Sequence, residues 1–336
     1  MKTEKEQVKQ YMLRLISVKD KALVKKTMDS FGKARSTVYN YLSELLEDGY
    51  ITKNGEDFTL TYKEYRFAYK NGGTLSESRI CSADFEPLIR AFPKNVISVW
   101  RYAFMEMMNN AIEHSRSENI YLTVRVDTVK TTLLIEDDGV GIFQNIREYV
   151  MKESGEDLPI DECAALLFAG KFTTAKSLHS GEGIFFTSHM MDDFLIVSDN
   201  VRFTRDNFHD ELFSTLQKTG GTLVAMTLYN SSKKTAREVF DRFSNVEEGF
   251  VRTAIPIAHF FPNGDPISRS EARRLGEVIS GFREVELDFA GTEEVGQAFV
   301  HELFVVWQRS NPEIHLTVQN VCENVDFMIR RVLNTK

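Results

Sequence analysis

The chain has 336 residues, of which 42% are apolar and 27% charged, and its formal net charge is −8. This length is enough for two or three hydrophobic cores, so we expect several domains in a multidomain α/β protein. The composition is that of a globular protein and excludes fibrous and disordered classes.

The first residues contain no apolar secretory core, and no stretch approaches the ~18 apolar residues of a membrane span. We therefore expect a cytoplasmic protein without membrane association. The three cysteines, Cys81, Cys163 and Cys322, lack the paired spacing of a zinc site or a redox motif, and we interpret them as reduced thiols.

Residues 1–70 form the first expected domain, which is locally basic because it holds fourteen Lys/Arg and ten Asp/Glu. Apolar periodicity predicts three helices, over 7–16, 23–31 and 36–49. A hairpin follows over 50–62, and its turn is predicted at Asn54 and Gly55, a pair that accepts positive φ angles.

Three helices followed by a hairpin resemble a winged helix-turn-helix. The resemblance makes residues 36–49 the recognition helix of a DNA-binding module. The groove-reading candidates are Ser36, Thr37, Tyr39 and Asn40. Lys33 and Arg35 are candidates for phosphate contacts, which position a protein on DNA without reading sequence. Winged helices also serve as protein-docking or dimerisation modules, so both interpretations stay open.

The second expected domain covers residues 74–228 and follows a polar, glycine-rich boundary at residues 71–73. A long amphipathic helix over 93–115 comes first. Apolar segments then predict further elements, with strands at 120–126, 131–137, 194–199 and 221–228 and a helix at 183–191. This order indicates an α/β sandwich with one helical layer on a mixed sheet.

Four motifs in this domain carry candidate chemistry. In the first, Glu106 and Asn110 stand four residues apart and so share a helix face. On such a face a carboxylate polarises a water molecule, while the amide oxygen binds Mg²⁺, which prefers oxygen ligands.

The other three motifs combine glycines with polar side chains. Asp137 precedes Gly139 and Gly141, where a carboxylate can accept a hydrogen bond and glycines let the backbone lie close to a ligand. Gly181 and Gly183 precede a helix whose amides are suited to phosphate oxygens. Thr222 follows two glycines at the start of the last strand, where its hydroxyl can take part in a hydrogen bond.

Together the four motifs resemble the GHKL superfamily, which includes gyrases, histidine kinases, mismatch-repair ATPases and anti-sigma-factor serine kinases. The resemblance implies a Bergerat-type domain that binds ATP and Mg²⁺. It makes Glu106 the catalytic base, Asn110 the Mg²⁺ ligand and Asp137 the reader of the adenine amino group. Gly139, Gly141, Gly181 and Gly183 become the nucleotide-loop residues, and the Thr222 hydroxyl would complete the adenine pocket through a water molecule. Residues 151–180 become the ATP lid, from which Lys171 reaches the phosphates.

Residues 229–249 are expected to be a linker, and residues 250–336 a small α/β domain in which strands and helices alternate. A capping box is predicted at Ser268 and Glu271. The segments 268–274 and 285–304 resemble STAS-like domains related to anti-sigma-factor antagonists. In the antagonists, a serine at the start of the helix that follows the LDF-type strand is phosphorylated.

This chain has no serine at that position and offers Gly296, Gln297 and Ala298 instead. Thr292 is the nearest hydroxyl and is interpreted as a loop or cap residue.

The preferred functional prediction is a homodimeric transcriptional regulator. Mg-ATP binding and slow hydrolysis would control its contacts with DNA or with a protein that binds the STAS-like domain. Two alternatives stay open, a serine/threonine kinase that acts on a separate partner and a nucleotide-binding interaction scaffold.

Overall fold

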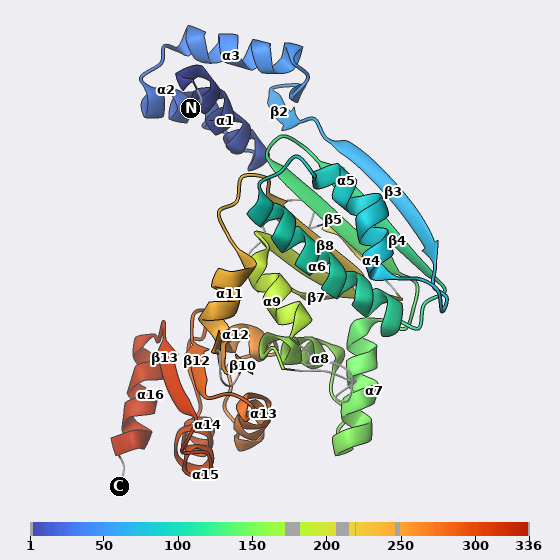
Figure 1. Ribbon diagram of the computed structural model, residues 1–336. Helices are drawn as coiled ribbons and strands as arrows, with labels where there is room; N and C mark the ends of the chain where they lie inside the picture. Colours follow the sequence, from blue (N-terminus) through green and yellow to red (C-terminus); the bar gives the residue numbers. More distant parts are fainter. Residues whose placement is uncertain (1–2, 172–181, 206–214, 219, 246–248, 335–336) are drawn as a thin grey trace.

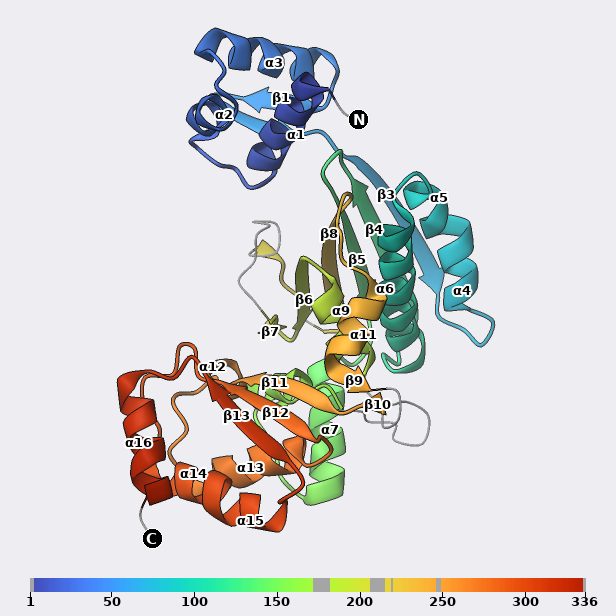
Figure 2. The same ribbon diagram turned by 60° about the vertical axis from the view of Figure 1, so that its left-hand side comes forward.

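The protein consists of three units that follow one another along its long axis, with the N-terminal helices at one end and the C-terminal sheet at the other (Figures 1 and 2). The structure is a computed structural model that describes residues 3–171, 182–205, 215–218, 220–245 and 249–334. Among the helices in these ranges, none combines the length and apolarity that a bilayer span requires.

The N-terminal unit has the predicted order of three helices and a hairpin. Its elements are α1 Glu4–Ser17, α2 Leu23–Phe31, α3 Arg35–Glu47, β1 Ile51–Asn54 and β2 Asp57–Leu60. Val8, Met12, Val38 and Leu42 form part of its separate hydrophobic core. The turn differs from the prediction by one position, because Asn54 pairs with Asp57 and leaves residues 55–56 as the loop.

The central unit is built on a six-stranded sheet in the order β3-β4-β5-β8-β6-β7. Its strands are β3 Lys63–Lys70, β4 Asn119–Val126, β5 Lys130–Asp137, β6 Asp193–Ser198, β7 Val201–Phe203 and β8 Leu223–Tyr229. Each neighbouring pair is antiparallel, so the expectation of a mixed sheet was wrong.

Strand β3 corrects the expected boundary between the first two domains. It pairs with β4 along its whole length, and its alternate residues Tyr65, Phe67 and Tyr69 pack against the central core. The central unit therefore begins at Lys63 rather than at residue 74. An edge strand with one buried face needs apolar residues only at alternate positions, which is the pattern found here.

A helical layer covers one face of this sheet (Figure 1). Its main members are α6 Lys94–Glu113 and α9 Gly183–Met190, which pack against each other. Shorter pieces precede them, namely α4 Glu77–Ile80, the π-helical segment Cys81–Phe85 and α5 Glu86–Ile89. The fully buried Trp100 and Phe104 of α6 pack against Phe85, with ring centroids 5.6 and 4.9 Å away.

Two segments expected to be a lid and a linker contain helices. After α7 Ile142–Ser154, the expected lid continues with α8 Ile160–Ala165 and a 3₁₀ turn over Leu166–Phe168, while residues 172–180 lie outside the described ranges. The expected linker contains α11 Ala236–Phe243, which packs on α6 and α9, and so it is not a simple connection. The short strands β9 Ser244–Asn245 and β10 Gly249–Phe250 follow it.

The C-terminal unit has a parallel sheet of β11 Arg252–Pro256, β12 Glu284–Asp288 and β13 His315–Gln319. Its helices are α12 Ile257–Phe260, α13 Arg269–Ile279, α14 Gln297–His301, a π-helical segment Glu302–Trp307, α15 Gln308–Ser310 and α16 Glu323–Asn334. The predicted capping box is confirmed: the Glu271 amide donates to the Ser268 hydroxyl, and the Ser268 amide donates to the Glu271 carboxylate.

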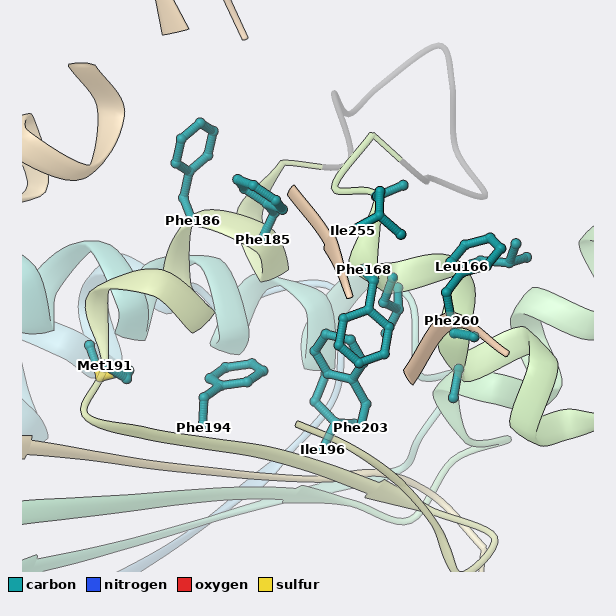
Figure 3. Packing of buried hydrophobic residues seen from close by; sticks show 14 of the residues in the cluster. Leu166, Phe168, Phe185, Phe186, Met191, Phe194, Ile196, Phe203, Ile255 and Phe260 are labelled. Carbon is teal, nitrogen blue, oxygen red and sulfur yellow. The ribbon is translucent and has the colours of Figure 1, made fainter. Parts of the chain in front are cut away.

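The central and C-terminal units share one continuous hydrophobic core. Figure 3 shows Phe185 and Phe168 of the central unit near Ile255 and Phe260 of the C-terminal unit. Phe250 lies 4.7 Å from Phe185, measured between ring centroids. Burial of large aromatic side chains dominates core energetics, so these two units are stabilised as one body.

Candidate functional site

The polar centre of the candidate site is Asp137, the last residue of β5. Its carboxylate Oδ1 accepts hydrogen bonds from the backbone amides of Gly139, at 2.9 Å, and Thr222, at 3.2 Å. Only 4% of the residue is exposed. Burial raises the pKa of this carboxyl above its ordinary value, and the two amides oppose that shift.

Glycines surround Asp137 because the backbone segments lie too close for side chains. A Cβ atom at Gly139 would overlap the carbonyl group of Ser115, and one at Gly221 would overlap the carbonyl group of Asp137. At Gly141, where φ is +84°, a Cβ atom would lie 2.5 Å from the Ser198 hydroxyl. The motifs at 137–141 and 220–222, far apart in sequence, therefore form one closely packed region.

Thr222 holds this region together. Its backbone carbonyl accepts from the Asp137 amide at 2.9 Å, and its hydroxyl accepts from the Ile142 amide at 3.0 Å, at the first residue of α7. A hydrogen bond from the Thr222 side chain also opposes the rise in the pKa of Asp137. The predicted adenine-pocket residues Asp137 and Thr222 are thus neighbours.

The remaining motifs meet along helix α6. At Gly183, the first residue of α9, a Cβ atom would overlap the Glu106 carboxylate, so this carboxylate lies against the glycine backbone. Asn110 follows one helical turn later. Beyond the helix end, the Ser115 carbonyl accepts from the Val140 amide at 3.0 Å. Helix α6 therefore connects the Gly183 region to the Asp137 region, with Asn110 between them.

Asn110 is the residue that sequence analysis assigns to Mg²⁺. In the described ranges, no group of three or more His, Cys, Asp or Glu side chains is arranged to hold a metal. Mg²⁺ commonly binds through one or two protein oxygens together with phosphate oxygens and water. A single amide oxygen from Asn110 is consistent with that mode.

Of the two other predicted phosphate-binding residues, one lies away from this region and one falls outside the described residues. Lys171 donates a 2.7 Å hydrogen bond from its ammonium group to the Gly281 carbonyl and lies over the Phe282 ring, 4.6 Å from its centroid. It therefore contacts the C-terminal unit in this structure. Gly181 lies outside the described residues, so only Gly183 of that motif has a known position.

Sequence reasoning missed Ser115 and Ser198 as parts of this region. The Ser198 hydroxyl donates a 2.9 Å hydrogen bond to the Gly221 carbonyl and is fully buried. Ser198 precedes Asp199 and Asn200, which both have positive φ angles. The turn-forming pair Asp-Asn was the sequence signal that could have located it.

The DNA-contact candidates lie at the N-terminal end of α3. Val38 is buried, whereas Arg35, Ser36, Tyr39 and Asn40 are exposed and Thr37 is half-buried. The Arg35 guanidinium lies 5.6 Å from the centroid of the Tyr39 ring. Lys33 forms a 2.7 Å ion pair with Glu4 of α1.

The C-terminal unit lacks an accessible hydroxyl at the expected acceptor position. Thr292 is 3% exposed, and its hydroxyl has no hydrogen-bond partner among the described residues. At Gly296, which precedes α14, a Cβ atom would overlap the Ile267 backbone. Since a serine cannot occupy that position without movement of the backbone, the sequence difference has a structural reason.

Comparison with protein families identifies residues 271–326 as similar to a STAS-like domain of unknown function (DUF4325). The match lies within the three-stranded parallel unit and agrees with the predicted STAS-like character of this end of the chain. No curated protein matches the sequence.

Proposed function

We propose that the chain is an ATP-controlled regulator whose central unit binds Mg-ATP and whose N-terminal unit contacts DNA, in a homodimer. The observation that supports nucleotide binding is the convergence of the four motifs. Asp137, Gly139 and Thr222 share direct contacts, and Glu106 lies against Gly183.

Each polar residue of the site would have a different task. Asp137 would accept a hydrogen bond from the adenine amino group through the carboxylate oxygen that its backbone partners leave available. Asn110 would hold Mg²⁺, which supplies charge neutralisation of the phosphates. Glu106 would accept a proton from a water molecule, in the manner of a general base.

The segment that follows α7 would link ATP binding to the C-terminal unit. Glu162 in α8 pairs with Arg274 of the C-terminal unit, and Lys171 is bound to Gly281. A ligand shifts a conformational balance only through different affinities for the two states. ATP would therefore act by favouring a state in which these contacts with the STAS-like unit differ.

The ATP-dependent change would alter DNA binding through α3, because the first turn of this helix is exposed and carries Arg35, Ser36 and Tyr39. Two linked half-sites in a dimer would raise the affinity through effective concentration. Double replacement of Lys33 and Arg35 by Ala should weaken binding of duplex DNA and flatten its dependence on salt. If DNA affinity depends on salt concentration equally in the variant and the wild type, Lys33 and Arg35 do not contact DNA.

Calorimetric titration of ATP into Asp137→Asn and Asp138→Asn tests nucleotide binding. Asp138 is a matched control, because it is exposed and its Oδ1 accepts from the Glu118 and Asn119 amides. Asp137→Asn places an amide donor against the adenine amino group, at a cost of about 1 to 3 kcal/mol, so the affinity should fall roughly tenfold or more. Equal ATP affinity in both variants would refute the assignment of the pocket.

A further inference from the structure

A cleft of about 730 Å³ lies between the N-terminal unit and the central unit. Helix α1 contributes Tyr11 and Arg14 to one wall, and the opposite wall includes Tyr229 at the end of β8. Small-molecule sites commonly have volumes of about 300 to 1,000 Å³. The cleft also differs in place from the candidate nucleotide site: it includes Ser188, near the C-terminal end of α9, whereas Gly183 begins that helix.

The lining of the cleft is strongly cationic. Its four basic residues come from different parts of the chain: Arg14, Arg205, Lys234 and Arg242. Asp192 is the acidic residue of this lining, and it is already engaged, because it accepts from the Tyr229 amide at 2.8 Å and pairs with Lys234 at 2.8 Å. Asp192 therefore offsets Lys234, and it pairs with neither Arg14 nor Arg242.

Two of the arginines have their guanidinium groups available for a ligand. Arg14 lies over the Tyr229 ring at 5.5 Å from its centroid, and Arg242 lies over Phe243 at 5.1 Å. Within the part of the chain that the structure describes, neither forms an ion pair, and both are exposed. Stacking on an aromatic ring orders a guanidinium group while its N–H donors stay available.

A histidine also lines the cleft. The His189 ring packs between Phe185 and Phe243, with centroids 4.2 and 4.4 Å away, and its Nδ1 lies 2.8 Å from the Phe185 carbonyl oxygen. Burial lowers the pKa of His189 to about 2, and the charges of Arg205, Arg242 and Lys234 act in the same direction. The imidazole is therefore neutral and forms part of the wall.

We propose that this cleft binds a small organic phosphate, with its phosphate group held between Arg14 and Arg242. Guanidinium groups match phosphate oxygens through paired hydrogen bonds, and Tyr11 and Tyr229 line the same cleft, where their rings would contact the organic part. Because Arg14 belongs to the N-terminal unit and Arg242 to α11, the ligand would join the two units. This site is independent of the proposed ATP function.

Calorimetric titration of the full chain with inorganic pyrophosphate, in buffer without Mg²⁺, tests the proposal. Wild type should bind one pyrophosphate in the cleft, and R14Q/R242Q should weaken that binding at least tenfold. R237Q is the matched control, since Arg237 lies on the same helix, is exposed and pairs with Asp241. D137N should leave pyrophosphate binding unchanged, and R14Q/R242Q should leave ATP binding unchanged, which separates the two sites.

Three outcomes would overturn the proposal. One is an R14Q/R242Q variant that binds pyrophosphate as tightly as wild type does. Another is a loss of pyrophosphate affinity in R237Q equal to that in R14Q/R242Q, which would indicate a general effect of net charge. The third is displacement of pyrophosphate by a 20-bp DNA duplex with a steep dependence on salt, because the cleft would then belong to a nucleic-acid surface. Circular dichroism and thermal unfolding of each variant check that the fold is retained.

Discussion

The hydroxyl group of Thr253, on the first strand of the C-terminal sheet, donates a 2.9 Å hydrogen bond to the carbonyl oxygen of Ala169 in the central unit. Both residues are buried. The Glu162–Arg274 ion pair and the Lys171–Gly281 hydrogen bond connect the same two units. The segment that sequence analysis assigns to a lid is therefore held by the STAS-like unit.

The variant Thr253→Val should destabilise the protein, because it leaves the buried Ala169 carbonyl without a donor. An unsatisfied buried acceptor costs about 1 to 3 kcal/mol. Urea unfolding should show this loss. Thr317→Val is the control, since Thr317 is exposed and its hydroxyl makes a long 3.4 Å hydrogen bond to Val285. Equal free energies of unfolding for the two variants would contradict the importance of the Thr253 contact.

Local signals predicted several features of the fold. The Ser268 capping box, the long helix that carries Glu106 and the order of elements in the N-terminal unit all follow from short-range patterns. Such patterns depend on backbone hydrogen bonding and on apolar periodicity within one element. The proximity of Asp137 and Thr222 was predicted through the family resemblance, since no local rule joins residues so far apart.

Features that depend on tertiary contacts were missed. Strand β3 pairs with β4, and nothing within 63–70 identifies that partner. Helix α11 stands in an expected linker and buries Phe243 against Phe185, with ring centroids 4.9 Å apart. The position of Lys171 depends on the Gly281 carbonyl of another unit. Side-chain periodicity carries no information about which surface an element will contact.

The variant Ser268→Ala should lower stability by about 1 kcal/mol, since the side-chain acceptor for the Glu271 amide is lost at the start of α13. Thermal unfolding is the measurement. Ser268→Asp should restore most of the loss, because a carboxylate also caps a helix N-terminus. Ser270→Ala should have a smaller effect, and an equal effect would mean that the cap contributes little.

The stability of the protein should depend on the ionisation of Asp137. Burial raises its pKa in the folded state, so the protonated form favours folding. That contribution is present below the unfolded pKa of about 4 and is lost as pH rises through the folded pKa. Asp137→Asn should therefore unfold at higher denaturant concentration than wild type at pH 7, and the difference should shrink as the solution is acidified.

Asp138 is the control for this pH dependence, because its ionisation should affect stability in the opposite direction. Hydrogen bonds from Asn119 lower the pKa of Asp138, so the ionised form favours folding. That contribution is present above the unfolded pKa and is lost as pH falls through the folded one. Asp138→Asn should therefore reduce stability at pH 7. If the stability of both variants relative to wild type changes with pH in the same way, the surroundings of Asp137 and Asp138 do not determine this pH dependence.

The C-terminal unit should remain unphosphorylated when the protein is incubated with Mg-ATP. The hydroxyl nearest in sequence to the expected acceptor position is that of Thr292, which is buried, and a Cβ atom at Gly296 would overlap the Ile267 backbone. Intact mass measurement and peptide mapping check this expectation. A stoichiometric phosphate between Phe250 and Lys336 would restore the interpretation of a kinase fused to its own substrate.

Glu106 and Asn110 lie on the same face of α6, and their replacement should affect ATP hydrolysis and ATP binding differently. Loss of a general base lowers a rate by roughly 10² to 10⁴ and leaves ground-state contacts in place, so Glu106→Gln should bind ATP normally and hydrolyse little. Asn110→Ala should lose affinity mainly when Mg²⁺ is present, because its oxygen is assigned to the metal. Phosphate release and ATP calorimetry, each with and without Mg²⁺, distinguish the two effects. A Glu113→Gln variant of the same helix serves as a control. If Glu106→Gln hydrolyses ATP as wild type does, or if Asn110→Ala loses affinity equally without Mg²⁺, the proposed roles along this helix are incorrect.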